Sequence, residues 1–192
     1  MKNVLKNILK SDQTVFSFKD LYLRFKDVDK DKLKSKLNYY VKTGDLYHIR
    51  RGLYAKNSGY DRFELATKIF IPSYISFETV LVSAGIIFQY YSQIFVATYQ
   101  SREIECDNKI YIFRRLSDTI LTNFNGVNII KNYSIASKER AFLDVVYLYR
   151  EYHFDNLDPL DWDIVFNILP IYQTKSIEQR VNRYYKSFKN QK

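Results

Sequence analysis

The chain contains little cysteine, histidine, glycine or proline. Its 192 residues include one cysteine (Cys106), two histidines (His48 and His153), five glycines and three prolines. A single cysteine excludes a disulfide within the chain, and one cysteine with two histidines is too few to favour a zinc site. The apolar content of 46% is ordinary for a globular protein, which excludes a wholly disordered chain.

Long apolar runs are also missing. The sequence has no run of about 18 apolar residues, so we expect no transmembrane helix and no membrane partner. Residues 1–12, MKNVLKNILKSD, combine helical apolar spacing with no small-residue cleavage site, so we expect a first helix there and not a secretion signal. The expected location is therefore the cytoplasm.

Positive charge is concentrated in the first third of the chain. Residues 1–60 contain 14 Lys or Arg and 6 Asp, a net charge of +8, whereas residues 61–192 contain 16 basic and 15 acidic residues, a net charge of +1. A basic segment joined to a near-neutral one is typical of a polyanion-binding module attached to a second domain. A lysine-rich solvated surface would produce the same asymmetry.

The first third also has the pattern of three helices followed by a hairpin. Ser17 is placed to cap a second helix, and a third helix is predicted for residues 29–43, ending at Gly44. Strands are predicted at residues 46–50 and 53–55, on either side of Gly52. This is the element order of a winged helix-turn-helix, so we predict that residues 1–57 form a DNA-binding domain of that class.

The predicted third helix carries the residue types that read DNA. Its apolar positions share one face, while cations, an amide, a hydroxyl and an aromatic ring share the other. Cations suit phosphates, and Asn and Ser side chains pair with base edges; the arginines beside the hairpin glycine suit phosphates or the minor groove. A solvated lysine-rich helix and a dimer contact at the hairpin are the alternatives. The predicted DNA-binding residues are Lys32, Lys34, Ser35, Lys36, Asn38, Tyr39, Lys42, Arg50, Arg51 and Lys56.

The rest of the chain, residues 58–192, predicts a second domain. β-rich stretches at residues 93–100, 109–116, 119–124 and 126–130 precede helical ones, with a hairpin turn expected at residues 125–126. Four helix starts are predicted from capping residues, at Ser76, Ser137, Asp158 and Ser176. The expected fold class is thus α+β: a winged helix-turn-helix, then a mixed domain with a small antiparallel sheet and C-terminal helices.

The sequence has no recognisable catalytic constellation. It lacks a glycine-rich phosphate loop and a GxSxG motif, and the sequence indicates no basic partner that would activate Cys106. Glu105, Asp107 and Lys109 form an E-x-D-x-K motif that faintly suggests the Mg²⁺ site of a nuclease, although alternating charges beside a turn are usually a wet surface. We therefore expect no enzyme activity, no cofactor and no metal, with a Mg²⁺-dependent nuclease as the minor alternative.

Three stretches together resemble the AbiEi-type antitoxins of bacterial abortive-infection, type IV toxin–antitoxin systems. They are GDLYHIRRGLYAK at 44–56, YISFETVLVSAGII at 74–87 and IASKERAFLDVVYL at 135–148. The first resembles the family's arginine-glycine-aromatic wing, and the second its serine-initiated helix, except that Ala84 stands where a histidine is frequent. The third resembles the family's alanine-serine-acid-alanine-aspartate helix through Ala136, Ser137, Glu139, Ala141 and Asp144.

This resemblance implies a two-domain protein that represses its own operon and opposes a nucleotidyltransferase toxin. It implies an inverted-repeat operator bound by two copies of the chain, and it leaves open whether the toxin is contacted directly. Ser137, Glu139, Arg140 and Asp144 are candidates for the antitoxin function, and a capped core helix would explain them equally well. A basic module that binds RNA or the toxin itself is the alternative function.

Overall fold

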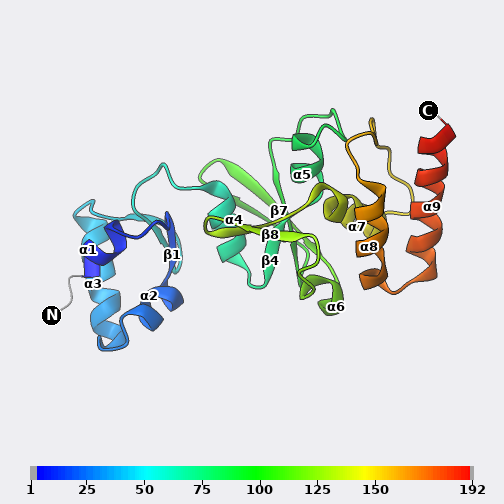
Figure 1. Cartoon of the computed structure of the whole chain (residues 1–192). Helices are drawn as coiled ribbons and strands as arrows, with labels where there is room; N and C mark the ends of the chain where they lie inside the picture. Colours follow the sequence, from blue (N-terminus) through cyan, green and yellow to red (C-terminus); the bar gives the residue numbers. More distant parts are fainter. Residues whose placement is uncertain (1–3, 191–192) are drawn as a thin grey trace. The chain divides into compact units, whose positions relative to one another are not determined.

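The computed structural model describes residues 4–190, so the start of the predicted first helix, residues 1–3, lies outside the described residues. The chain forms two compact units, one ending at Ile69 and the other beginning at Phe70 (Figure 1). The sequence predicted a boundary at residue 57. The structure instead assigns the helix that follows, α4 (Arg62–Ile69), to the first unit.

Contacts with the start of the chain explain why α4 belongs to the first unit. The buried carboxylate of Glu64 accepts hydrogen bonds from the backbone N–H of Thr14, at 2.8 Å, and from its hydroxyl, at 2.7 Å. Lys68 forms an ion pair with Asp20 at 3.0 Å. These partners are about 50 residues away along the chain, so the sequence carried no local sign of them.

The first unit contains three more helices and a three-stranded antiparallel sheet. The strand order is β1-β3-β2. The predicted second and third helices and the hairpin are present, whereas β1 is only three residues long and was not predicted. The elements are α1 (Val4–Leu9), β1 (Val15–Ser17), α2 (Phe18–Arg24), α3 (Lys30–Lys42), β2 (Tyr47–Arg50) and β3 (Leu53–Ala55).

Local signals set the bounds of the two central helices. The Ser17 hydroxyl accepts the Asp20 N–H at 3.0 Å and the Asp20 carboxylate accepts the Ser17 N–H at 3.4 Å, so the predicted cap is a complete capping box. Asp29 caps α3 by accepting two backbone N–H groups, each at 3.1 Å. Past the end of α3, Gly44 takes a φ of +79°, which a residue with a Cβ adopts at a cost.

The core of the first unit fixes which face of α3 meets solvent. Leu33 and Leu37, one turn apart, are fully buried against residues from the other elements of this unit. The rest of the cluster consists of Val4, Ile8, Phe16, Leu21, Phe25, Leu46 and Tyr54. Since the leucines anchor one side of α3, the polar side must face outward.

The second unit combines a six-stranded sheet with helices, most of which follow the last strand, and this confirms the predicted α+β class. The strand order is β6-β7-β5-β4-β9-β8, with β4–β5, β6–β7 and β8–β9 antiparallel and β5–β7 and β4–β9 parallel. The strands are β4 (Ser73–Ile75), β5 (Ile94–Thr98), β6 (Arg102–Cys106), β7 (Lys109–Arg115), β8 (Val127–Ile130) and β9 (Tyr133–Ala136). The helices are α5 (Glu78–Ser83), α6 (Asp118–Leu121), α7 (Lys138–Leu148), α8 (Trp162–Ile168), the 3₁₀ helix η1 (Leu169–Tyr172) and α9 (Lys175–Asn190).

α7 is the central helix of this unit. Every residue from Glu139 to Val146 is buried, because α7 packs against α5, α8, α9 and β9. Figure 1 shows α7 beside α8. Ser137 caps it as predicted, accepting the Arg140 N–H at 3.2 Å. Charged side chains on a helix that is buried on all sides must find their partners within the fold.

Two sequence predictions between the strands are wrong. Residues 119–124 were expected to form a strand, but α6 occupies Asp118–Leu121, and the carbonyl groups of this segment bond to a buried arginine described below instead of to a neighbouring strand. The hairpin turn was expected at residues 125–126, but β8 and β9 pair across the turn after Ile130, where Lys131 has a φ of +52°.

Three predicted helix starts are also displaced. The N-cap of α5 is Phe77, which takes a φ of +56° without a side-chain cap, because the Ser76 hydroxyl is used in the core. Asp161 caps α8 in place of Asp158. α9 begins at Lys175, so Ser176 lies within its first turn and not at its cap.

Candidate nucleic-acid interface

The outward face of α3 exposes most of the predicted DNA-binding residues. Tyr39 is among them, with 61% of its surface exposed. Lys36 is half-buried, and the other members are exposed: Lys32, Lys34, Ser35, Asn38 and Lys42. This face offers hydrogen-bond donors of both charged and neutral types, as a surface that reads nucleic acid needs.

A groove joins α3 to the hairpin. It encloses about 730 Å³ and is lined by Lys34 and Asn38 from α3 and by Arg51 and His48 from the hairpin. The remaining lining residues are Phe18, Lys30, Asp31, Gly52 and Tyr54. The structure thus brings residues of α3 and of the hairpin together, and these residues carry phosphate-binding and base-reading groups.

The hairpin turn explains why Arg51 is available. Gly52 has a φ of +77°, and a Cβ built there would meet nothing within 4 Å. The glycine is therefore required by its backbone conformation and not by a lack of room for a side chain. The turn leaves Arg51 exposed beside the groove. His48 is also exposed there and contacts the ring of its cross-strand partner Tyr54, with ring centroids 5.6 Å apart. Strand alternation would have indicated His48 as a groove residue, but the sequence reasoning missed it.

The other side of α3 carries several acidic residues beside its lysines. Lys32, Ser35 and Lys36 line a second hollow of about 740 Å³, together with Asp27, Val28, Asp29 and Asp31. A polyanion at this hollow would meet three carboxylates, one of which already caps the helix. Lys34 and Arg51 are therefore better placed for phosphates than Lys32 and Lys36 are.

Two further predicted residues are tied into the fold. Lys56 donates through Nζ to the backbone carbonyl of Ser11. Arg50 is half-buried, and its Nη1 is enclosed without a hydrogen-bond partner among the described residues. The groove collects Lys34, Asn38 and Arg51, while Arg50 and Lys56 are not among the residues that line it.

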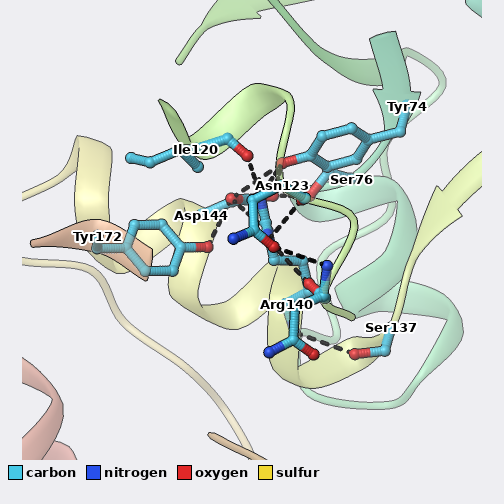
Figure 2. A network of polar contacts seen from close by, with 9 residues as sticks. Tyr74, Ser76, Ile120, Asn123, Ser137, Arg140, Asp144 and Tyr172 are labelled. Carbon is cyan, nitrogen blue, oxygen red and sulfur yellow. Dashed lines mark hydrogen bonds and ion pairs between the residues drawn. The ribbon is translucent and has the colours of Figure 1, made fainter. Parts of the chain in front are cut away.

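In the second unit, the predicted residue Asp144 is the centre of a buried network (Figure 2). Its Oδ1 accepts a hydrogen bond from the Tyr172 hydroxyl at 2.7 Å and from Arg140 Nε at 3.3 Å. Its Oδ2 accepts from the Ser76 hydroxyl at 2.7 Å and from the Tyr74 hydroxyl at 3.0 Å. Each carboxylate oxygen therefore accepts at least two hydrogen bonds.

Arg140 occupies the other half of the network and fixes the backbone after α6. Its Nη2 donates to the Ile120 carbonyl at 2.7 Å, and its Nη1 donates to the Asn123 carbonyl at 3.3 Å (Figure 2). Nη1 also donates to the Asn125 carbonyl at 2.8 Å. The side chains of Arg140 and Asp144 are both 0% exposed. A buried ion pair is favourable only when its remaining donors and acceptors are satisfied, and here they are.

The protonation states follow from burial and from these neighbours. Burial raises the pKa of Asp144, while Arg140 and the hydroxyl donors act in the opposite direction. Burial and the nearby carboxylate hold the pKa values of Tyr74 and Tyr172 well above the ordinary value for tyrosine. Both tyrosines therefore keep their protons and act as donors to Asp144.

The other two candidates for the antitoxin function are also part of the fold. Ser137 caps α7, and Glu139 is buried, accepting the Asp161 N–H at 3.3 Å at the start of α8. Since Arg140 and Asp144 are enclosed as well, a partner protein has no access to three of the four side chains. The capped core helix, which the sequence left as an equal alternative, is supported by this geometry.

The E-x-D-x-K motif spans the turn between β6 and β7. Glu105 is exposed opposite Ile110, Lys109 pairs with Cys106, and Asp107 takes a φ of +50° in the turn. Within residues 4–190, no group of three or more His, Cys, Asp or Glu side chains is arranged to hold a metal ion. The Mg²⁺-dependent nuclease stays the minor alternative that the sequence left open.

Comparison with known proteins gives no assignment. No family model matches the chain, and no curated protein matches it. Of the helices described, none has the length and apolar character needed to cross a membrane. The resemblance to AbiEi-type antitoxins accordingly stays a prediction from the three sequence stretches.

Proposed function

We propose that the chain is a DNA-binding autorepressor that also serves as the antitoxin of an AbiE-like type IV toxin–antitoxin system. The observation that carries the DNA-binding part is the groove in which Lys34 and Asn38 of α3 lie beside Arg51 of the hairpin. The order of elements in the first unit, with a hairpin directly after the third helix, is the one expected of a winged helix-turn-helix.

The dimensions of α3 suit the major groove. Its 13 residues extend about 20 Å at 1.5 Å per residue, and a B-DNA major groove about 12 Å wide admits a helix. In this arrangement Asn38 pairs with a base edge, adenine being its preferred partner, while Lys34 and Arg51 contact phosphates on either side. The net charge of +8 on residues 1–60 supplies the sequence-independent attraction.

The antitoxin part rests on the resemblance of three sequence stretches. It assigns the second unit the task of opposing a nucleotidyltransferase toxin in the cytoplasm, without enzymatic activity of its own. The burial of Arg140 and Asp144 supports a division in which α7 holds this unit together. Any direct contact with the toxin then uses exposed residues on other elements.

The DNA-binding proposal is tested with the DNA upstream of the gene. Purified protein is titrated into that segment and into a scrambled duplex of equal length, over a series of salt concentrations. We expect preferential binding to the upstream segment, with affinity that falls steeply as salt rises. Equal and weak binding to both duplexes would reduce the first unit to a generic basic surface.

A separate experiment addresses the antitoxin part. The gene is co-expressed with the neighbouring open reading frame, provided that this encodes a nucleotidyltransferase-like protein, and growth is compared with that of cells expressing the neighbour alone. We expect rescue by the full chain and by a variant that no longer binds the operator, because repression and neutralisation are assigned to different units. Failure of both to rescue growth would contradict the antitoxin assignment while leaving the repressor intact.

A further inference from the structure

Three arginines line one pocket in the second unit. Arg150 follows the end of α7, and Arg180 and Arg183 lie one turn apart on α9. The pocket encloses about 420 Å³, and its other lining residues are Glu151, Tyr152, His153 and Tyr184. This volume lies in the range of ordinary small-molecule sites, which extend from about 300 to 1,000 Å³.

The walls of this arginine pocket are fixed by hydrogen bonds. The Tyr184 hydroxyl donates to the Tyr152 carbonyl at 2.7 Å and accepts the Tyr152 N–H at 3.1 Å, which holds the segment after α7 against α9. Arg180 Nη1 donates to the Tyr149 carbonyl at 2.7 Å, and its Nε donates to the Ser176 carbonyl at 3.2 Å. These bonds fix the Tyr152 backbone against α9 and hold Arg180 in one orientation, while Arg150 and Arg183 are exposed.

The positive charge of the arginine pocket is not balanced by the protein. Glu151 is the one carboxylate among its lining residues. The guanidinium groups of Arg150 and Arg183 make no ion pair or hydrogen bond with another residue in the described range 4–190. Burial and repulsion from Arg150 and Arg183 lower the pKa of Arg180, with the neighbouring Tyr184 opposing them. An anion would relieve this repulsion, and guanidinium groups match phosphate oxygens with paired hydrogen bonds.

A second hollow continues from the arginine pocket. It encloses about 490 Å³ and shares Tyr152, His153 and Tyr184 with the first. Its remaining walls combine the rings of Phe154 and Phe188 with polar groups from Asp155, Asn156, Asp158 and Ser187, beside Leu157. Phe154 is buried against the rings of Phe142, Tyr152 and Tyr184, so the half-buried Phe188 is the ring that offers a planar base an apolar surface. The carboxylate and amide groups suit a sugar hydroxyl, in contrast to the cationic first pocket.

We propose that the second unit binds a nucleoside di- or triphosphate, with the phosphates on Arg150, Arg180 and Arg183 and the nucleoside in the adjoining hollow. This site is separate from the DNA-binding groove, and it requires neither repressor nor antitoxin function. The second unit would then contain a ligand-binding pocket in addition to the buried network around Asp144.

Calorimetric titration of the full-length protein with ATP, pyrophosphate and adenosine tests the proposal. We expect saturable micromolar binding of ATP at one site, weaker binding of pyrophosphate and weaker still of adenosine. Arg150→Gln and Arg183→Gln should each weaken ATP binding roughly tenfold, since each removes a charged phosphate contact. Arg180 is left unchanged because it also holds the backbone.

Two control variants separate the pocket from general charge. Arg102→Gln removes an exposed arginine of β6, and Arg24→Gln removes an exposed arginine of α2 in the first unit; both should bind ATP like the unaltered protein. Lack of saturable binding, or equal ATP affinity in Arg183→Gln and Arg102→Gln, would overturn the site. Equal affinity for pyrophosphate and ATP would overturn the nucleotide assignment, as would binding of a single-stranded oligonucleotide at these arginines without binding of ATP. Urea unfolding of each variant checks that the fold is kept.

Discussion

Arg140 and Asp144 lie one turn apart on α7, with Nε 3.3 Å from Oδ1 and neither side chain exposed. The pair connects elements that are distant in sequence, because Asp144 holds the hydroxyls of Tyr74 and Tyr172 while Arg140 holds the carbonyls after α6. Such a pair contributes little net stability relative to an apolar core. Removal of one member, however, leaves the charge of the other buried without a partner, which is strongly destabilising.

Asp144→Ala should therefore strongly destabilise the second unit. We expect the free energy of unfolding to fall by about 3–5 kcal/mol, because the Arg140 charge would remain buried without a counter-ion. Tyr172→Phe, which removes a single donor to the carboxylate, should cost about 1.5–3 kcal/mol. Urea unfolding followed by tryptophan fluorescence measures both, since Trp162 lies in this unit. A normally stable Asp144→Ala protein that fails only as an antitoxin would argue for a role in partner binding instead.

Arg51→Ala should weaken DNA binding and reduce its dependence on salt. The loss of one phosphate contact lowers the slope of log K against log salt by about 0.9. Arg24→Ala, which removes an exposed arginine of α2 that does not line the groove, is the matched control. Fluorescence anisotropy at several salt concentrations gives both slopes. An Arg51→Ala slope equal to that of the unaltered protein would exclude the hairpin from the interface.

Asn38→Ala should change sequence preference more than overall affinity. A bidentate contact to a base edge contributes about 1–3 kcal/mol of discrimination, so the variant should tolerate substitutions at one operator position that the unaltered protein rejects. Competition with a set of single-substituted operators identifies that position. A uniform loss across every operator variant would mean that Asn38 only positions the backbone.

The ion pair of Asp20 with Lys68 should make the first unit sensitive to acid. Burial acts to raise the pKa of Asp20, but Lys68 and the Ser17 hydrogen bonds outweigh it, and the folded-state pKa is lowered. The stabilisation is thus complete above the unfolded-state value of about 3.9 and is lost as the pH falls through the lower folded-state value. Asp20→Asn should cost about 0.5–1 kcal/mol at neutral pH, since Asp20 is partly exposed. That difference should disappear in urea unfolding once the pH is below the folded-state pKa of Asp20; a constant difference at every pH would rule out the ionic contribution.

Gly126→Ala should destabilise the second unit more than Gly85→Ala does. Both glycines have positive φ, +75° and +69°, so both substitutions carry a backbone cost of about 1 kcal/mol. Only at Gly126 would the new Cβ approach other atoms closely, at 2.7 Å from Ile168 Cδ1 and 2.9 Å from Arg140 Cβ. The difference between the two variants in thermal unfolding isolates this overlap. Equal melting temperatures would mean that the neighbours of Gly126 move aside freely.

The elements that the sequence predicted well carry their signals locally. Ser17 and Asp20, three residues apart, form the capping box of α2, and Leu33 and Leu37 define the buried side of α3. Gly44 stops that helix because of its own backbone conformation. Each of these features depends on residues within one or two helical turns, which is the range over which pattern and propensity operate.

The features that the sequence did not predict depend on distant partners. Ser76 looks like a helix cap but donates to Asp144, 68 residues further along. Residues 119–124 have the composition of a strand, yet Arg140 binds their carbonyls and α6 forms instead. The arginine pocket likewise depends on distant partners, because it is lined by Arg150 and by residues of α9. In each case tertiary contacts overrode local preference, and no spacing in the sequence records them.

The parallel pairing of β4 with β9 affects how the chain folds during synthesis. Ile75 pairs with Ile135, so β4 must wait until the ribosome has made a strand 60 residues later. The first unit, by contrast, has all of its elements once residue 69 has emerged from the ribosome. Because domains fold as units from the N-terminal end, a nascent chain carries a finished first unit while β4 still lacks a strand on one edge. Chains stalled before residue 135 would have an unpaired strand edge open to aggregation or to a chaperone.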